Sequence, residues 1–333
     1  MRRFLILAAA LVAIAVLAGG VAGWWFDREF RTPGPSSDEV TVVIPSGASV
    51  AAIAEQLETA GIVEKAWVFR WGVRAFGSDR PLQAGEYRFD PHMSPAAVMA
   101  LLAEGRQVQR RLTIPEGLSN REVLALVAAA DALTGDVPDA SRYQEEGAFL
   151  PETYFYAFGD DRTKLLDRME SEMRTTLAAL WETRAPDLPF DTPKAALTLA
   201  SIIEKETSLA SERPRIAGVF VNRLERGMAL QSDPTVIFAL TSGEAPLGRR
   251  LTYDDLEIDN PYNTYRYPGL PPSPIANPGR DAIAAALNPM STEELYFVAD
   301  GTGGHAFART LDEHNQNVAR WREIRDQADD AAE

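Results

Sequence analysis

Apolar residues are distributed unevenly along this chain, and the longest apolar block comes first. Residues 4–26 carry no charged side chain and are almost wholly apolar. A helix rises about 1.5 Å per residue, so this stretch would be roughly 34 Å long, enough to cross the core of a bilayer. Two arginines precede the stretch, and Trp24 and Trp25 lie at its end. Positive residues favour the cytoplasmic side and aromatic residues the interface, so residues 1–27 predict a transmembrane anchor with a cytoplasmic N-terminus.

A cleaved signal peptide is the alternative interpretation of this block. Small residues such as Ala18, Gly20 and Ala22 could serve a signal peptidase. However, the apolar stretch is long for a signal peptide, and a Trp pair at its end is typical of an anchor, so we expect it to be retained. Residues 28–39 are rich in Pro, Ser and Gly and predict a linker.

Beyond this segment, short β-branched runs alternate with helical patterns. Residues 40–44 predict a strand that ends in a Pro-Ser-Gly turn and leads into a helix. A similar strand, turn and helix recur around residues 115–117. Between them, residues 85–89 look like a strand, and Ser94 followed by proline predicts a helix start. We expect an α+β protein with a small α/β module at 40–110, which serves either as a scaffold or in carbohydrate binding.

The helical pattern over residues 193–207 ends with two glutamates, Glu204 and Glu206. Thr192 is the predicted N-cap, and a proline follows it as the first helical residue. Four residues have the i, i+3, i+4, i+7 spacing of one helix face: Leu199, Ile202, Ile203 and Glu206. We therefore expect Glu206 to point into an apolar environment and Glu204, on the opposite side, to be solvated.

An apolar environment would suit Glu206 to acid catalysis. Burial disfavours the charged form of a carboxyl and so raises its pKa, as a general acid requires at neutral pH. The alternative is a structural glutamate paired with an arginine such as Arg213 or Arg223, because charged residues are seldom buried unpaired. Helical spacing alone leaves both interpretations open.

The region after this helix is rich in amide, hydroxyl, carboxylate and aromatic side chains, the mixture that a sugar-binding cleft requires. A further aromatic segment, residues 147–156, precedes the helix and contains Glu152. The candidate substrate-binding residues are Asn222, Gln231, Asp233, Tyr262, Asn263, Thr264, Tyr265 and Glu152.

Composition excludes several other classes of function. The formal net charge of −15 argues against a nucleic-acid partner, which needs a cationic surface. The chain has no cysteine, and its three histidines form no His-Glu-x-x-His pattern, so we expect no metal and no cofactor. The glycine-rich residues 300–305 predict a turn, with His305 as a polar support. Residues 312–326 predict an amphipathic helix, and 326–333 a solvated acidic tail.

Ordered motifs over most of the chain resemble the YceG-like (MltG) family of endolytic murein transglycosylases. The resemblance combines the N-terminal anchor with a series of short motifs in a fixed order. These motifs lie at residues 114–117, 146–154, 200–207, 220–224, 230–236, 262–265, 269–272 and 296–305. A single motif of this kind would be unspecific, whereas the ordered series is highly specific.

The resemblance implies a single-pass protein of the bacterial inner (cytoplasmic) membrane, with a LysM-like module near the membrane and a periplasmic catalytic domain at 111–325. It implies peptidoglycan glycan strands as the substrate and peptidoglycan synthases as partners. The family uses one essential glutamate, which corresponds to the glutamate followed by threonine, here Glu206.

The implied reaction is cleavage of the β-1,4 bond between N-acetylmuramic acid and N-acetylglucosamine in nascent strands, which ends chain elongation. Glu206 would act first as acid and then as base, leaving a 1,6-anhydro end, while Asn222, Gln231 and Tyr262 hold the sugar. One alternative is a hydrolytic muramidase with Asp233 or Glu152 as a second carboxylate. The other is a wall-binding adaptor without catalytic activity.

Overall fold

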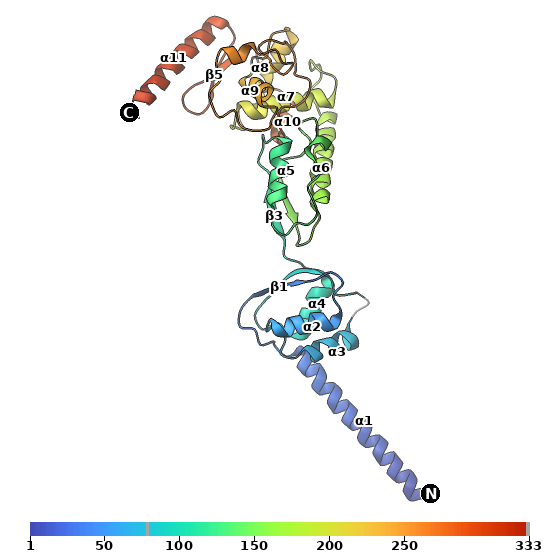
Figure 1. The fold of residues 1–333 in the computed structure, drawn as a ribbon. Helices are drawn as coiled ribbons and strands as arrows, with labels where there is room; N and C mark the ends of the chain where they lie inside the picture. The colour runs from blue at the N-terminus through green and yellow to red at the C-terminus, as the bar shows by residue number, and fades with distance from the viewer. Residues whose placement is uncertain (78–79, 331–333) are drawn as a thin grey trace. The chain divides into compact units, whose positions relative to one another are not determined.

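The protein forms two compact units in the computed structural model, which describes residues 1–77 and 80–330 (Figure 1). The first unit contains Met1–Arg110 and Phe155–Asp160, and the second contains Arg111–Tyr154 and residues 161–330. Both units mix helices with short strands. The predicted α+β class is therefore confirmed.

Helix α1 (Arg2–Arg31) is the one helix in the described part of the chain that is long and apolar enough to cross a membrane. Its apolar window is wholly exposed, as a lipid-facing helix requires. The helix extends beyond the predicted anchor, and Phe30 near its end is buried. The last turn of α1 thus belongs to the folded part of the first unit.

The remainder of the first unit packs around a small antiparallel sheet. Strand β1 (Val40–Ile44) pairs with β2 (Gly85–Phe89), and the connection between them contains α2 (Val50–Thr59) and α3 (Ala66–Phe76). Helix α4 (Pro95–Glu104) follows, and its cap Ser94 accepts a hydrogen bond from the Ala97 backbone N–H. Apolar side chains of these elements form one core, including Ile44, Leu57, Phe69, Tyr87, Phe89 and Leu102.

The segment predicted as a linker is partly helical and partly held by backbone contacts. Residues 28–31 continue α1, and the Gly34 N–H donates to the carbonyls of His92 and Met93 at 3.3 and 3.2 Å. A side chain at position 34 would collide with the carbonyl oxygens of Ile62 and Met93. Glycine is therefore needed where this segment crosses the first unit.

Strand β3 (Arg110–Thr113) pairs with β4 (Thr153–Tyr156), and the second unit begins at the second residue of β3, Arg111. Helix α5 (Asn120–Ala129) starts with the capping box of Ser119 and Glu122, and η1 (Ala140–Arg142) follows it. Helix α6 (Arg162–Glu182) then leads to the predicted helix, α7 (Pro193–Glu206).

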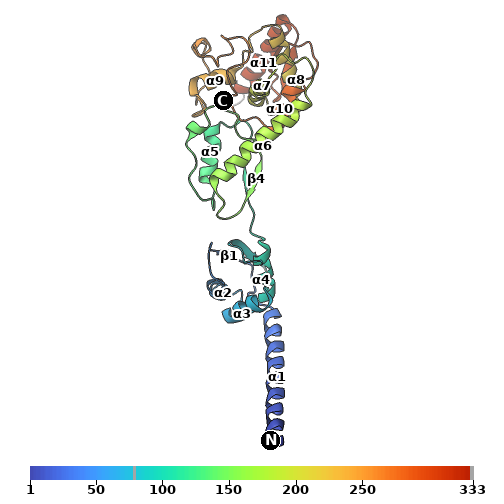
Figure 2. The same cartoon turned by 90° about the vertical axis from the view of Figure 1, so that its right-hand side faces the viewer.

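Helix α7 is the centre of the second unit (Figure 2). Thr192 caps it by accepting from the Ala195 N–H at 3.2 Å, as predicted. It contacts α6, α8 (Arg213–Glu225), α9 (Asp233–Thr241) and α10 (Arg280–Leu287). Every residue from Ala196 to Ile203 is buried, so α7 has neighbours on all sides rather than one apolar face.

The C-terminal part adds a β-hairpin and a helix. Strand β5 (Tyr296–Ala299) pairs antiparallel with β6 (His305–Ala308), and residues 300–305 include the predicted turn. Helix α11 (Leu311–Asp330) includes the predicted amphipathic segment and the start of the expected acidic tail, while residues 331–333 lie outside the described part. The short helix η2 (Asp254–Glu257) precedes the loop before α10.

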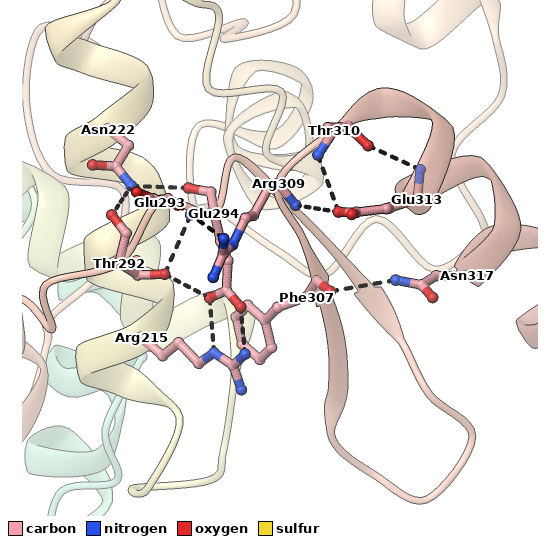
Figure 3. A network of polar contacts seen from close by, with 10 residues as sticks. All are labelled: Arg215, Asn222, Thr292, Glu293, Glu294, Phe307, Arg309, Thr310, Glu313 and Asn317. Atoms are coloured by element: carbon pink, nitrogen blue, oxygen red, sulfur yellow. Dashed lines mark hydrogen bonds and ion pairs between the residues drawn. The ribbon is translucent and has the colours of Figure 1, made fainter.

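Polar contacts fix the segment before the hairpin to α8 (Figure 3). Arg215 on α8 forms an ion pair with Glu294, and Nε of Arg215 donates to Glu294 Oε2 at 2.8 Å. Thr292 donates its hydroxyl to the same carboxylate at 2.9 Å. Because α8 also packs against α7, these contacts hold the hairpin in a defined position relative to the end of α7.

Candidate active site

Glu206 is the last residue of α7 and lines a pocket of about 470 Å³. The next residue, Thr207, is extended and ends the helix. The pocket wall comes from α7, α8, the loop that enters α9, the β5–β6 hairpin and α11. The lining residues are Glu206, Arg223, Leu230, Gln231, Asp233, Tyr265, Tyr296, Phe297, Val298, Ala299, His305, Leu311 and His314.

The hydroxyl of Ser232 is directed at the Glu206 carboxyl. Ser232 is at the N-cap position of α9, where a serine commonly accepts a hydrogen bond from the helix backbone. Here it makes no side-chain cap, and its Oγ donates to Glu206 Oε1 at 2.5 Å. The Ser232 carbonyl accepts from the backbone N–H and the hydroxyl of Thr235 instead. Ser232 is 1% exposed, so water does not compete for this contact.

Burial raises the pKa of Glu206 to about 7, and the negative charge of Asp233 acts in the same direction. The Ser232 hydrogen bond and the positive charges of His305 and Arg223 oppose the rise. The carboxyl can thus be protonated near neutral pH and still has partners that stabilise its ionised form. A group that must give and later regain a proton needs both properties.

Arg223 lies near Glu206 but is bound to backbone carbonyls. Its Nε donates to Leu295 O at 2.6 Å, and its Nη1 donates to Leu230 O at 2.7 Å. The guanidinium also lies over the Tyr296 ring at 5.4 Å from its centroid. It therefore adds positive charge to the pocket without forming the structural ion pair that was the alternative for Glu206.

Glu204, rather than Glu206, forms a structural ion pair with an arginine. The prediction that Glu204 is solvated is therefore wrong. The Glu204 side chain is 5% exposed. Its Oε1 accepts from Arg213 Nη2 at 3.0 Å, and its Oε2 accepts from the Gly279 N–H at 2.9 Å. The same Arg213 Nη2 donates to Glu116 at 2.8 Å. Helical spacing assigned Glu204 to solvent because it could not include the partners that α8 and the start of α10 bring to that side.

Three of the predicted binding residues lie in the pocket with Glu206: Gln231, Asp233 and Tyr265. The Tyr265 hydroxyl donates to Asp233 Oδ1 at 2.6 Å. Gln231 has a φ of +51°, a left-handed conformation that is uncommon for this residue type. Its N–H donates to the Thr264 carbonyl at 3.1 Å, which holds it there. Strained backbone of this kind is concentrated at functional sites.

Two candidates support the loop below the pocket. Asn263 is fully buried, its side chain donates to the carbonyls of Leu256 and Ile258, and its Oδ1 accepts from the Tyr265 N–H. Thr264 is 1% exposed, and its hydroxyl accepts from the Ser232 N–H at 3.1 Å. The pair therefore position Tyr265 and Ser232.

The remaining candidates are outside the described pocket lining. The Asn222 amide donates to the carbonyls of Thr292 and Glu294 at 2.8 and 2.9 Å (Figure 3). The Tyr262 hydroxyl lies 2.6 Å from Ser273 Oγ, and its ring packs against Phe238. Glu152 is exposed beside β4, and its carbonyl accepts from the Ile114 N–H. The structure does not bring these three to Glu206.

Four aromatic residues of the pocket were not predicted as binding groups: Tyr296, Phe297, His305 and His314. Tyr296 and His314 stack with ring centroids 5.2 Å apart, and Nδ1 of His314 is buried without a hydrogen-bond partner. His305 Nδ1 lies 2.8 Å from Glu212 Oε2, and Glu212 Oε2 also accepts from the Thr207 hydroxyl at 3.3 Å. The dipeptide Tyr296-Phe297 and the turn histidine were visible in the sequence, but their approach to α7 depends on the hairpin.

A second carboxyl with a raised pKa, Glu146, lies elsewhere in the second unit. Burial raises its pKa to about 7. Its Oε2 accepts from the Asn120 N–H at 2.6 Å, at the start of α5. This contact gives Glu146 a structural role at a helix N-terminus, where a carboxylate is favourable. It is not among the residues that line the pocket of Glu206.

The fold and the site define a class of protein: an α+β protein with an N-terminal apolar helix and a carboxyl of raised pKa in a polar and aromatic pocket. The model of the YceG-like family matches residues 42–320. The chain therefore belongs to the YceG-like family, as the motifs indicated.

Similar proteins and a similar solved structure agree with this family membership. An endolytic murein transglycosylase of Bacillus subtilis (strain 168) is 33% identical over 316 residues, which cover 86% of this chain and 86% of the relative. An endolytic murein transglycosylase of Streptococcus pneumoniae serotype 2 (strain D39 / NCTC 7466) is 31% identical, over 93% of this chain and 64% of the relative. A crystal structure of the YceG-like protein lmo1499 from Listeria monocytogenes superposes with a TM-score of 0.51 at 33% identity, over 84% of this chain and 99% of that chain.

Proposed function

We propose that this protein is an endolytic lytic transglycosylase that cleaves peptidoglycan glycan strands, with Glu206 as its only acid–base catalyst. The observation that carries the proposal is the Glu206 carboxyl itself, which lines the pocket, has a pKa near 7 and is bound by Ser232. The names of the Bacillus and Streptococcus relatives support the same reaction class.

The bond cut is the β-1,4 link between N-acetylmuramic acid and N-acetylglucosamine. Protonated Glu206 donates its proton to the glycosidic oxygen as the bond breaks, and positive charge develops at the anomeric carbon. The resulting carboxylate is stabilised by the Ser232 hydroxyl and by the charge of Arg223. It then takes the proton from the C6 hydroxyl of the muramic residue, whose oxygen closes on C1. The strand ends in a 1,6-anhydro sugar, and no water is consumed.

The other pocket groups bind and orient the sugar in this proposal. Gln231 presents an amide from a backbone fixed by Thr264, and Tyr265 and Tyr296 present aromatic surfaces. His305 is oriented by Glu212, and Glu212 also contacts Thr207 directly after the catalytic residue. A shift of Glu212 would therefore affect both the acid and the histidine that faces it.

Hydrolysis by a muramidase mechanism is the second candidate, because Asp233 lines the same pocket and its charge acts on Glu206. A hydrolase uses a second carboxylate to activate water. Digestion of purified glycan strands in ¹⁸O-labelled water separates the two. We expect products with unlabelled anhydro ends, lighter than hydrolysed ends by one water molecule. Labelled reducing ends would overturn the transglycosylase proposal in favour of the muramidase.

We also propose that α1 anchors the protein in the inner membrane with its N-terminus in the cytoplasm. Arg2 and Arg3 on one side and Trp24 and Trp25 on the other support this orientation. The catalytic unit would then act in the periplasm on nascent strands, end their elongation and work beside peptidoglycan synthases. The β1–α2–α3–β2 unit is the candidate LysM-like module, with glycan binding as its proposed role.

A further inference from the structure

Helix α3 of the first unit has an exposed face of aromatic and basic residues. Trp67, Arg70, Trp71 and Arg74 have the i, i+3, i+4, i+7 spacing of one face, and all four are exposed. Trp67 is 41% exposed and Trp71 52%. The opposite side, which includes Val68 and Phe69, is buried in the core of the unit. Two neighbouring exposed tryptophans on a short helix indicate a contact surface.

This face lies beside the last turns of α1. The ring centroid of Trp67 is 6.0 Å from that of Trp25, and the two rings are stacked. Phe26 contacts Trp67 in the first turn of α3 and Phe76 in its last turn, each at 6.2 Å between centroids. Helix α3 therefore crosses α1 rather than following it, and both views place it at the base of the first unit (Figures 1 and 2).

Close packing fixes this crossing. Phe30 of α1 is buried, and a side chain at Gly72 of α3 would collide with its ring. Lys65 at the start of α3 donates to Glu29 of α1 at 2.7 Å. The angle between the two helices is thus held by an aromatic contact and an ion pair, so α1 and α3 form one rigid corner.

The depth of the face follows from α1. Trp24 and Trp25 close the apolar stretch, where aromatic residues prefer the boundary between lipid tails and headgroups. Trp67 stacks on Trp25 and so lies at the same depth. A helix that crosses α1 at this depth runs roughly along the membrane surface, with tryptophans and arginines toward the lipid, as interfacial helices do.

The charges around the face favour anionic headgroups. Arg70, Arg74 and Arg28 supply positive charge, although the chain as a whole is strongly negative. The acidic residues in the same region are mostly neutralised: Glu29 pairs with Lys65, and Asp27 pairs with Arg31 at 2.9 Å. Two exposed acids lie at the start of α3: Glu58 accepts a hydrogen bond from the Ala66 N–H at 3.1 Å, and Glu64 lies 3.7 Å from Lys65.

We propose that the exposed face of α3 binds the headgroup region of a bilayer that contains anionic phospholipid, so that the first unit is attached to the membrane at two points. This inference rests on the proposed anchoring by α1. Lipid is the occupant because the face continues the aromatic end of the membrane helix at the same depth. Because α1 and α3 form one rigid corner, the second point of attachment limits the tilt of α1 in the bilayer and so fixes the height of the first unit above it.

The absence of cysteine from the chain permits a direct test on the full-length protein. Single cysteines replace Arg70 on the face, Leu11 in the apolar stretch and Thr41, the exposed residue of β1, and each carries a nitroxide spin label. The labelled proteins are placed in nanodiscs of phosphatidylglycerol and phosphatidylethanolamine. Collision rates with oxygen, which concentrates in lipid, and with a water-soluble nickel chelate then report the depth of each label.

We expect the ratio of oxygen to nickel collisions at position 70 to lie between those at positions 11 and 41, severalfold above the value at 41. Adding Trp67→Ser and Trp71→Ser should bring it down to the value at 41. A label at 70 as exposed to water as that at 41, with position 11 in lipid, would overturn the docking and leave the anchor intact. A water-exposed label at 11 would overturn both. If the ratio at position 70 were the same in nanodiscs of phosphatidylcholine as in those with phosphatidylglycerol, the preference for anionic lipid would be overturned.

Discussion

Glu204 and Glu206 are separated by one residue at the end of α7, yet their side chains have opposite surroundings. Glu204 is held by Arg213 and by the Gly279 N–H, whereas Glu206 has one hydroxyl partner and a pocket. Removing the charge of Glu204 leaves a buried guanidinium with Glu116 as its nearest remaining partner. Removing the charge of Glu206 leaves no buried cation unpaired. We therefore expect Glu204 to contribute mainly to stability and, under the proposed function, Glu206 to contribute mainly to activity.

Glu204→Gln is expected to lower the free energy of unfolding by about 3 kcal/mol, because the buried guanidinium of Arg213 loses its buried carboxylate partner and keeps only the more exposed Glu116 nearby. Urea unfolding followed by circular dichroism measures the change. Glu293→Gln is the matched control: Glu293 pairs with Arg309 at the surface, where its side chain is 76% exposed. Its loss should cost about 0–1 kcal/mol. Equal effects of the two substitutions would contradict the structural role of Glu204.

Neutralising Glu206 should have an effect on stability that depends on pH. Its pKa is about 7 in the folded protein and 4.5 as the ordinary value, so the folded state binds the proton more tightly. The wild-type carboxyl therefore contributes most to the stability of the folded state below pH 4.5, and this contribution is lost as the pH rises toward 7. The stability of Glu206→Gln relative to wild type should increase over that window and level off above it. A difference that stays constant with pH would show that burial does not shift this group.

Activity should depend on the same pKa. Only the protonated carboxyl can donate, so kcat/KM is expected to fall about tenfold per pH unit above pH 7. Initial rates of anhydro-end formation between pH 5 and 9 measure this limb. A rate that stays constant up to pH 9 would exclude Glu206 as the proton donor.

At the scale of one residue, helical spacing predicted part of this site. It placed Glu206 beside Leu199 and Ile202 and led to an acid in an apolar environment, and in the structure Glu206 is half-buried. That inference assumed a single apolar face. Because α7 is surrounded, the assumption was wrong, and Glu204 is enclosed as well. The partners that distinguish the two carboxyls, Arg213 and Ser232, come from other elements and could not be located by spacing within α7.

At the scale of elements, the N-terminus of α9 influences the protonation of Glu206 through Ser232. The Ser232 hydroxyl lowers the pKa of Glu206 against the effect of burial. Ser232→Ala should therefore move the alkaline limb of the pH–rate profile upward by about one unit, since a hydrogen bond to a charged group contributes about 1.5–3 kcal/mol. The rate on the plateau should also fall, because the carboxylate that must act as base is less stabilised.

Ser208→Ala is the control for this substitution, because Ser208 is an exposed serine in the turn after α7. Its pH–rate profile should match that of the wild type. If Ser232→Ala left the limb in place, the hydroxyl would have no influence on the proton of Glu206.

Several elements were predicted from the sequence, whereas the helices α3, α9 and α10 were not. The N-cap residues Ser94 and Thr192 predicted the starts of α4 and α7, and both caps are present in the structure. Helix α3 was missed because Trp67 and Trp71 lie on its exposed face, which conceals the usual separation of apolar and polar sides. The pocket wall from β5 and β6 was missed for a different reason, since it depends on the contacts of Arg215 and Asn222 with the preceding segment (Figure 3).

At the scale of the whole molecule, the two units have separate apolar cores. Leu57 is fully buried in the first unit, so Leu57→Ala should cost that unit about 2–5 kcal/mol. Hydrogen exchange should show faster exchange in α2 and β2, with α7 amides protected as in the wild type. Cleavage of short soluble glycans should persist. Equal loss of protection in α7 would mean that the units unfold as one.

The most direct test of a lone catalytic acid is the rate at which full-length Glu206→Gln forms anhydro ends on purified glycan strands, relative to wild type at pH 6.5. General acid–base catalysis contributes about 10²–10⁴-fold, so the variant should retain no more than about one hundredth of the rate while unfolding as cooperatively as the wild type. Because glutamine preserves the shape of the side chain, a folded variant that cuts within a few-fold of the wild-type rate would contradict the assignment of Glu206 as the catalyst.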